Sequence, residues 1–130
     1  MNIDKKLITG IKDIDEQHES LFLAVDLFKV KAPSRDLLWD ILLGIERYSK
    51  LHFETEEAYM FKYAYPLLEE HAKEHANFSK TFEELKLGFE ESGFTEDFIE
   101  KFKKFMTTWL SNHYQNSDVH MADFLKEKMF

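Results

Sequence analysis

Two polar pairs with four-residue spacing dominate the middle of this 130-residue chain. His52 precedes Glu56, and His71 precedes His75. Residues four apart lie one turn apart on the same face of an α-helix, so each pair predicts a helix with two polar groups on one face. Tyr65-Pro66 interrupts the helical pattern between the pairs. The stretch therefore predicts two antiparallel helices whose polar pairs face each other.

The rest of the sequence also favours long helices. Only four glycines and two prolines occur, and 44% of the residues are hydrophobic, enough for one core. Apolar residues recur with helical spacing in four segments joined by short connections. We therefore expect a single all-α domain over residues 1–130, an up-down-up-down antiparallel four-helix bundle with an N-terminal arm and a short C-terminal helix. The expected arm and helices cover residues 1–12, about 13–30, 34–64, 66–89 and 95–113, and a short piece beyond 118.

Helix starts are predicted from residues that cap helices or suit their first turn. Asp13 or Asp15 is expected to cap the first helix, Ser34 the second and Thr95 the fourth, because their side-chain oxygens accept backbone N–H groups of a first turn. Pro66 suits the first turn of the third helix.

Charge and composition exclude several classes of function. The net charge is −8 and no basic run occurs, which makes binding to nucleic acid or to an anionic membrane surface improbable. The absence of cysteine excludes disulfides, thiolate metal sites and cysteine nucleophiles. No apolar run approaches the ~20 residues of a membrane span, and the first residues lack the apolar core of a secretory signal. We therefore expect a soluble, cytoplasmic protein, and the sequence predicts no oligomeric state.

Each predicted helix has an inward-facing stripe of apolar residues, here called its seam, and a histidine occupies that seam in every one of them. The starts of the first and third helices and the ends of the second and fourth meet at one pole of an up-down-up-down bundle, so these seams place their histidines in one layer. A buried carboxylate without a partner costs several kcal/mol, and a metal ion satisfies imidazole nitrogens and carboxylate oxygens together. The residues of this layer are His18, His52, Glu56, His71, His75 and His113.

Asp118 joins this set only under one condition. It follows His113 by five residues, which is roughly 140° around a regular helix. The two side chains converge only if the fourth helix ends or bulges between them, and Asn116-Ser117 is the expected place.

These residues also have other interpretations. A single histidine on an apolar seam is usually a hydrogen-bonded core residue. The segment from His71 to His75 also matches H-x-x-E-H, a zinc-peptidase motif with Glu74 as general base. That interpretation leaves four polar residues of the layer unexplained, and so short a chain leaves little room for a peptide cleft. The phenylalanine-rich seams indicate ordinary core, and His120 is expected to be exposed.

The sequence resembles the hemerythrin family, specifically the single-domain bacterial hemerythrins. The resemblance spans residues 10 to about 118 and departs at Asn2-Ile3-Asp4, where family members usually carry an aromatic residue. Its motifs are Ile14-Asp15-Glu16-Gln17-His18 with Leu21, His52-Phe53-x-x-Glu56-Glu57 with Met60, Tyr65-Pro66, His71-x-x-x-His75 with Phe78, and Trp109-Leu110-x-x-His113-x-x-x-x-Asp118.

The resemblance implies a centre of two iron ions (Fe2+/Fe3+) that binds O2. One iron would be held by His71, His75 and His113, and the other by His18 and His52. Glu56 and Asp118 would bridge both ions together with a solvent-derived oxo or hydroxo group. The iron with two histidines would keep a vacant position, where O2 would bind reversibly.

Dioxygen binding is favoured over catalysis because no Glu-x-x-His motif occurs, whereas oxygen-activating di-iron bundles are rich in carboxylates. We therefore expect an oxygen-binding protein for carriage, storage or sensing, not an enzyme, with O2 as its partner. Phe53, Trp109 and Leu110 are expected to wall the O2 pocket. The alternatives are a di-iron enzyme with peroxidase, NO- or iron-oxidising activity, and a signalling module that senses O2 or iron. Zinc or manganese would also suit these donor atoms.

Overall fold

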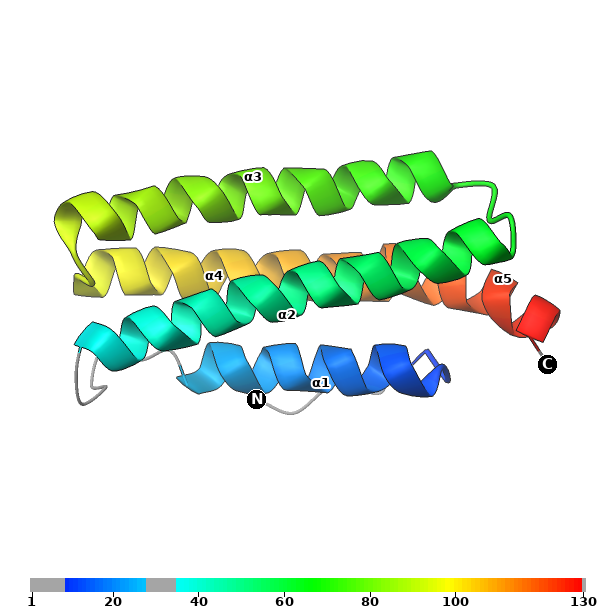
Figure 1. Ribbon diagram of the computed structural model, residues 1–130, viewed down its shortest axis with the longest axis horizontal. Helices are drawn as coiled ribbons and strands as arrows, with labels where there is room; N and C mark the ends of the chain where they lie inside the picture. The colour runs from blue at the N-terminus through cyan, green and yellow to red at the C-terminus, as the bar shows by residue number, and fades with distance from the viewer. Residues whose placement is uncertain (1–8, 28–34, 130) are drawn as a thin grey trace.

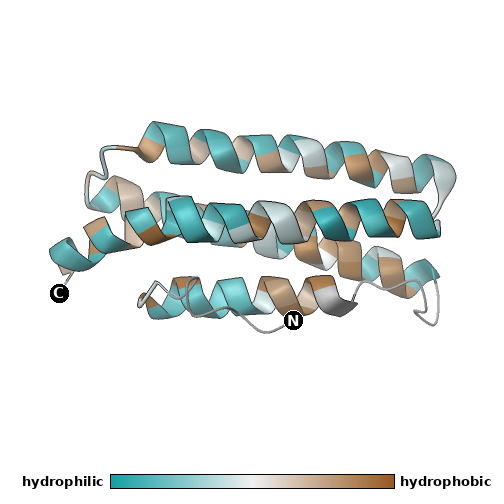
Figure 2. Ribbon diagram, turned by 180° about the vertical axis from the view of Figure 1, so that it is seen from behind, coloured by the Kyte–Doolittle hydropathy of each residue, from teal (hydrophilic) through white to brown (hydrophobic). Residues whose placement is uncertain are grey.

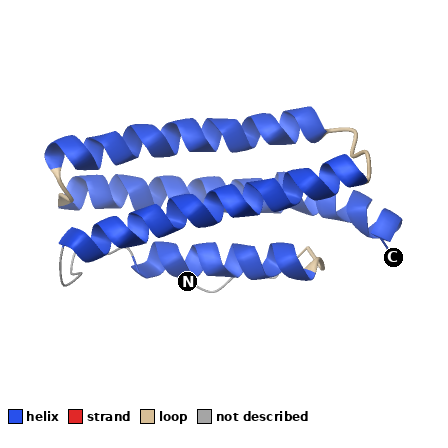
Figure 3. Ribbon diagram, viewed as in Figure 1, coloured by secondary structure: helices blue, strands red, loops and turns tan. Residues whose placement is uncertain are grey.

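Long antiparallel helices make up nearly all of the computed structural model, which describes residues 9–27 and 35–129 (Figures 1 and 3). Within those ranges there is no β-strand. Most of the expected N-terminal arm, the end of the first predicted helix and the Ser34 cap lie outside the described residues. The elements are α1 (Lys12–Leu27), α2 (Arg35–Lys62), α3 (Leu68–Ser92), α4 (Glu96–Asn112), the π-helical turn η2 (His113–Asp118) and α5 (Val119–Met129).

The helices alternate in direction, which confirms the up-down-up-down bundle. α1 packs mainly on α2 and also on α4, and α3 packs on α2 and α4. α1 and α3 begin at the end of the bundle where α2 and α4 finish, and α5 continues beyond that end (Figure 1). This arrangement is the one that the predicted histidine layer requires. That residues 1–130 form a single domain stays a prediction.

The start of α1 differs from the prediction. The helix begins at Lys12, so Asp13 and Asp15 lie inside it and neither caps it. Asp15 instead binds the segment that precedes the helix: its Oδ1 accepts from the Thr9 backbone N–H at 2.8 Å and from the Thr9 hydroxyl at 2.7 Å, and its Oδ2 accepts from the Gly10 N–H at 3.0 Å. Gly10 has φ +84°, a conformation that glycine adopts without strain. The carboxylate thus fixes the bend instead of the first helical turn.

The connection between α2 and α3 also corrects a prediction. α3 begins at Leu68, so Pro66 lies in the turn and not in the first turn of the helix. The Tyr65 N–H donates to the Met60 carbonyl at 2.9 Å and the Leu68 N–H to the Tyr65 carbonyl at 3.2 Å. These bonds close a turn that Pro66 fits because it needs no N–H donor there.

The start of α4 agrees with the prediction. The Thr95 side chain caps this helix by accepting the Phe98 N–H at 3.2 Å. Gly93, which ends α3, has φ +79°.

The core consists of two apolar clusters with a polar layer between them. The larger cluster fills the bundle from Leu38 and Phe89 up to Phe53 and Leu110. The smaller cluster lies at the end where α5 begins and includes Ile14, Met60 and Leu125. Apolar residues of each helix recur along its length, in line with an inward stripe (Figure 2). The layer of polar residues that the sequence predicts lies between these clusters, and both apolar clusters separate it from solvent along the bundle axis.

Candidate metal centre

All seven predicted ligand residues are buried, with exposed fractions of 3% or less. Their donor atoms form two overlapping groups, and within each group every donor atom lies within 4.8 Å of the others. Glu56 and Asp118 belong to both groups. The first group is Glu56, His71, His75, His113 and Asp118, and the second is His18, His52, Glu56 and Asp118.

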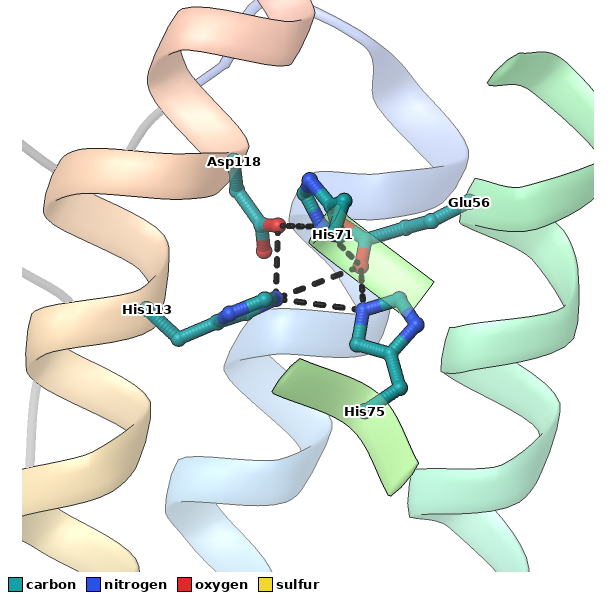
Figure 4. Close-up of side chains that lie close together, drawn as sticks. All are labelled: Glu56, His71, His75, His113 and Asp118. Atoms are coloured by element: carbon teal, nitrogen blue, oxygen red, sulfur yellow. Dashed lines mark hydrogen bonds and ion pairs between the residues drawn. The ribbon is translucent and has the colours of Figure 1, made fainter. Parts of the chain in front are cut away.

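Asp118 lies between the two groups of histidines. Its Oδ1 is 2.9 Å from Nε2 of His71 and 2.9 Å from Nε2 of His113 (Figure 4). Its Oδ2 is 2.9 Å from Nε2 of His18. The second histidine of the smaller group, His52, has its Nε2 3.7 Å from Oδ2. Each oxygen of this carboxylate thus faces two imidazoles, Oδ1 those of His71 and His113 and Oδ2 those of His18 and His52.

Glu56 lies on the opposite side of the centre. Its Oε1 is 3.0 Å from Nε2 of His75 and 3.5 Å from Nε2 of His71 (Figure 4). The same oxygen is 3.5 Å from Nε2 of His52. Its other oxygen, Oε2, is buried and makes no hydrogen bond with any described residue. Because Oε1 approaches histidines of both groups, Glu56 and Asp118 are both placed to bridge two ions.

The turn η2 brings His113 and Asp118 to the same centre. In a regular α-helix the two side chains would point about 140° apart. Here the helix widens into a π-helical turn, in which the Val119 N–H donates to the carbonyl of Tyr114, five residues earlier. The predicted bulge therefore exists and spans residues 113–118. Such turns inside α-helices are frequent at functional sites.

Hydrogen bonds outside the cluster fix how three of the imidazoles point. Nδ1–H of His52 donates to Gln17 Oε1 at 2.9 Å, and Nδ1–H of His75 donates to Glu57 Oε2 at 2.9 Å. Nδ1–H of His113 donates to Glu74 Oε1 at 3.1 Å. Because Nδ1 carries the proton in each ring, the Nε2 lone pair of the neutral imidazole points into the centre.

Two further contacts hold these partners in place. The Ser117 hydroxyl lies 2.7 Å from both oxygens of Glu74, and Gln17 Nε2 donates to the Thr55 hydroxyl at 3.1 Å. Glu74 is therefore engaged with His113 and Ser117, which disfavours the general-base role that the H-x-x-E-H interpretation would assign to it. Orientation by such partners is typical of metal-binding histidines.

The donor set fits a cation better than a network of hydrogen bonds. The Nε2 atoms of His75 and His113 lie 3.2 Å apart, and both rings donate from Nδ1 to carboxylates. Two lone pairs then face each other and need a proton or a cation between them. His71 Nε2 and Asp118 Oδ1 are 2.9 Å apart, yet neither makes a hydrogen bond of proper geometry within the described chain. Imidazole and carboxylate donors of this kind suit iron, zinc or manganese.

In the metal-free protein the centre keeps its carboxylates charged. Burial alone would raise the pKa of Glu56 and of Asp118, but the charges and hydrogen bonds of neighbouring histidines outweigh it, so both pKa values fall below their ordinary range. For His71 burial would lower the pKa, but the nearby carboxylates of Asp118 and Glu56 favour the protonated ring and raise it to about 9. The pKa of His113 is raised too, whereas that of His18 is lowered, chiefly by burial.

The three residues predicted to wall an O2 pocket lie beside the centre. The Phe53 ring stacks on His75 with centroids 4.0 Å apart, and the Trp109 ring stacks on His113 at 4.4 Å. Leu110 is fully buried in the larger core cluster. Trp109 and His113 also line a surface pocket of about 530 Å³. The role of these residues as a pocket wall stays a prediction.

The sequence did not predict that Gln17, Glu57 and Glu74 bind the Nδ1 atoms of the histidines, and it predicted no role for Tyr114. For Gln17 and Glu57, the only indication in the sequence was their position directly beside the predicted ligands His18 and Glu56. His120 is exposed as predicted.

The arrangement defines a class: an antiparallel four-helix bundle with a buried histidine and carboxylate cluster near one end. Residues 9–125 match the family described as "Hemerythrin HHE cation binding domain". The chain therefore belongs to the hemerythrin family.

Curated relatives agree with this assignment. The chain is 29% identical over 121 residues to a protein named bacteriohemerythrin from Clostridium acetobutylicum, covering 88% of this chain and 92% of the relative. It is 29% identical to the bacteriohemerythrin of Stenotrophomonas maltophilia, covering 90% of this chain and 76% of that protein. Identity to the bacteriohemerythrin of Pseudomonas paraeruginosa is 26%, covering 95% and 80% of the two chains. None of the described helices has the length and apolar composition needed to cross a membrane.

Proposed function

We propose that this protein binds dioxygen reversibly at a non-haem di-iron centre and serves in oxygen carriage, storage or sensing. The observation that carries the proposal is the position of Asp118, whose two carboxylate oxygens face different groups of histidines at 2.9 Å. A carboxylate shared in this way is suited to bridge a pair of ions. Membership of a family described as cation binding supports the same conclusion.

In this proposal the five histidines divide unequally. His71, His75 and His113 would hold one iron and His18 and His52 the other, while Glu56 and Asp118 would be shared by both. The unequal division follows the two groups of donor atoms. The side with two histidines has one protein donor fewer, so an exogenous ligand has room to bind there. A bound ferrous pair would supply a site for O2 and the two electrons needed for its reversible reduction.

The protein's own contribution is to orient the donors and exclude water. Gln17, Glu57 and Glu74 hold three imidazoles with Nε2 directed inward. The apolar clusters on both sides of the layer limit access of water and protons, which protects a reduced centre from irreversible oxidation. Phe53 and Trp109, stacked on His75 and His113, restrict the motion of those two rings.

We further propose that the centre binds O2 without oxidising a substrate. Five imidazoles and two carboxylates give a less anionic site than the carboxylate-rich centres of oxygen-activating bundles. Such a site stabilises high-valent iron less strongly. The protein is therefore proposed to be a binding protein, and not an enzyme.

Visible spectroscopy of the iron-loaded protein tests the proposal. We expect two iron ions per chain after anaerobic loading, a charge-transfer band on admission of air, and loss of that band on deoxygenation. His18→Gln should abolish the band, whereas the matched control His120→Gln, at an exposed histidine outside the cluster, should retain it. Much less than two iron ions per chain would refute a di-iron centre. Catalytic turnover of O2 under reductant, without a stable oxygenated form, would favour an enzyme.

A further inference from the structure

Tyr114 is a fully buried residue that the proposed ligand set does not use. It lies in η2, directly after His113, and its ring stacks on His18 with centroids 3.4 Å apart and planes inclined by 14°. The edge of His52 approaches it at 5.7 Å, and Phe22 packs against it at 5.6 Å. Its centroid is 6.2 Å from that of His113. Tyr114 therefore lies on the side of the centre that has two histidines.

The hydroxyl of Tyr114 makes no hydrogen bond with any residue in the described part of the chain. The other buried tyrosine, Tyr65, differs in this respect because its hydroxyl donates to His120 Nδ1 at 2.7 Å. A buried hydroxyl without a partner destabilises a folded protein by about 1–3 kcal/mol. Phenylalanine would fill nearly the same volume without this destabilisation. A hydroxyl at this position therefore indicates a hydrogen-bond partner that is not part of the fold and binds to it.

The hydroxyl of a tyrosine can act as a hydrogen-bond donor. A phenol has an ordinary pKa of about 10 and is therefore protonated at neutral pH, so it can donate one hydrogen bond.

We propose that Tyr114 is a ligand-orienting residue, whose hydroxyl donates a hydrogen bond to a small anionic or polarised ligand bound on the side of His18 and His52. The inference rests on the proposed function, because it requires a metal ion with an open position on that side. The partner atom is supplied by the ligand, which explains why the hydroxyl is buried without one. Azide, a small linear anion with a basic terminal nitrogen, is a suitable probe.

The first test uses metal-free protein and two matched substitutions. Tyr114→Phe removes a hydroxyl that has no partner in the fold and should raise the midpoint of thermal unfolding. Tyr65→Phe removes a hydroxyl that is hydrogen-bonded to His120 and should lower it. A lower midpoint for Tyr114→Phe would mean that the hydroxyl already stabilises the fold, and would refute the proposal.

The second test measures azide binding to the oxidised, iron-loaded proteins by visible absorption. Tyr114→Phe should weaken azide binding by about tenfold, because a hydrogen bond to a charged ligand is lost, whereas Tyr65→Phe should leave the affinity unchanged. In the wild-type protein the infrared stretching frequency of bound azide should shift between H2O and D2O, and the shift should disappear in Tyr114→Phe. Equal affinities, or a wild-type frequency insensitive to D2O, would overturn the inference.

Iron content and the reversible oxygen band, measured on the same wild-type sample, separate the two proposals. If the iron pair and the oxygen band are both present but Tyr114→Phe leaves the azide affinity unchanged, only the proposed role of this residue is wrong. If the wild-type protein takes up no iron pair, the proposed function fails and the role of Tyr114 fails with it.

Discussion

Metal uptake by this protein should depend steeply on pH, because the binding site holds protons when it is empty. The pKa of His71 is about 9 in the metal-free protein: burial would lower it, but the nearby carboxylates of Asp118 and Glu56 raise it. A metal ion binds the neutral imidazole, so the proton must leave first. His113, whose pKa is also raised, adds to the effect in the same direction.

The magnitude follows from the pKa of His71. At about pH 7 the protonated form exceeds the neutral form by roughly 100 to 1, so this residue alone lowers the apparent metal affinity about 100-fold relative to pH values above 9. The affinity should therefore rise about tenfold per pH unit between 7 and 9. A contribution from His113 would bring the slope closer to a hundredfold per unit.

The stability of the metal-free protein should change in the opposite direction. A raised histidine pKa stabilises the folded state below the unfolded value of 6.5, and this contribution is lost as the pH rises through about 9. For His71 the loss is about 3 kcal/mol. The lowered pKa of His18 acts in a different range, because it destabilises the fold below the unfolded value of 6.5 and has no effect on stability above it.

Zinc is a redox-silent probe for this test. Titration against a competing chromogenic chelator at several pH values between about 6.5 and 9 gives the slope, and calorimetry in buffers of different ionisation enthalpy counts the protons released. In Asp118→Asn, which removes the charge that holds the proton on His71, binding should be weaker and its slope flatter. A wild-type affinity that does not change with pH would refute the reasoning.

Three substitutions test other parts of the structure. Glu74→Gln weakens the partner of His113 and should reduce metal affinity about 10- to 100-fold in the same chelator assay, while Glu70→Gln, at an exposed position of α3, should not. Phe53→Ala should lower the free energy of unfolding by about 3–5 kcal/mol in urea melts, and a loss below about 1 kcal/mol would show that its packing is unimportant. Thr95→Ala removes the cap of α4 and should lower that free energy by about 1 kcal/mol; no change would contradict the capping role.

The bundle and its polar layer could be predicted because both depend on the spacing of residues along helices. His18, His52, His71 and His113 each interrupt an apolar stripe, and alternating helices bring such interruptions to one end. The bulge between His113 and Asp118 could be predicted because a five-residue separation cannot converge on a regular helix.

The features that were missed depend on contacts between distant segments. Asp15 could not be distinguished from a helix cap, because the backbone groups that it binds belong to the preceding bend. Glu57 and Glu74 are two acidic residues among many, and only the packing of the helices brings them to Nδ1 of a histidine. No role was predicted for Tyr114, because its position in the sequence does not indicate where its hydroxyl lies.

The π-helical turn has a consequence for how this chain can change in evolution. Deleting one residue inside it would leave His113 and Asp118 four residues apart, one turn apart on the same face of a regular helix, and would draw the later residues about 1.5 Å nearer. Asp118, Met121 and Leu125 would then keep nearly the same direction. Losing a second residue would turn them by about 100°, away from the histidines and from the apolar cluster that Met121 and Leu125 complete. The turn can therefore lose one residue without turning the last helix, but not two.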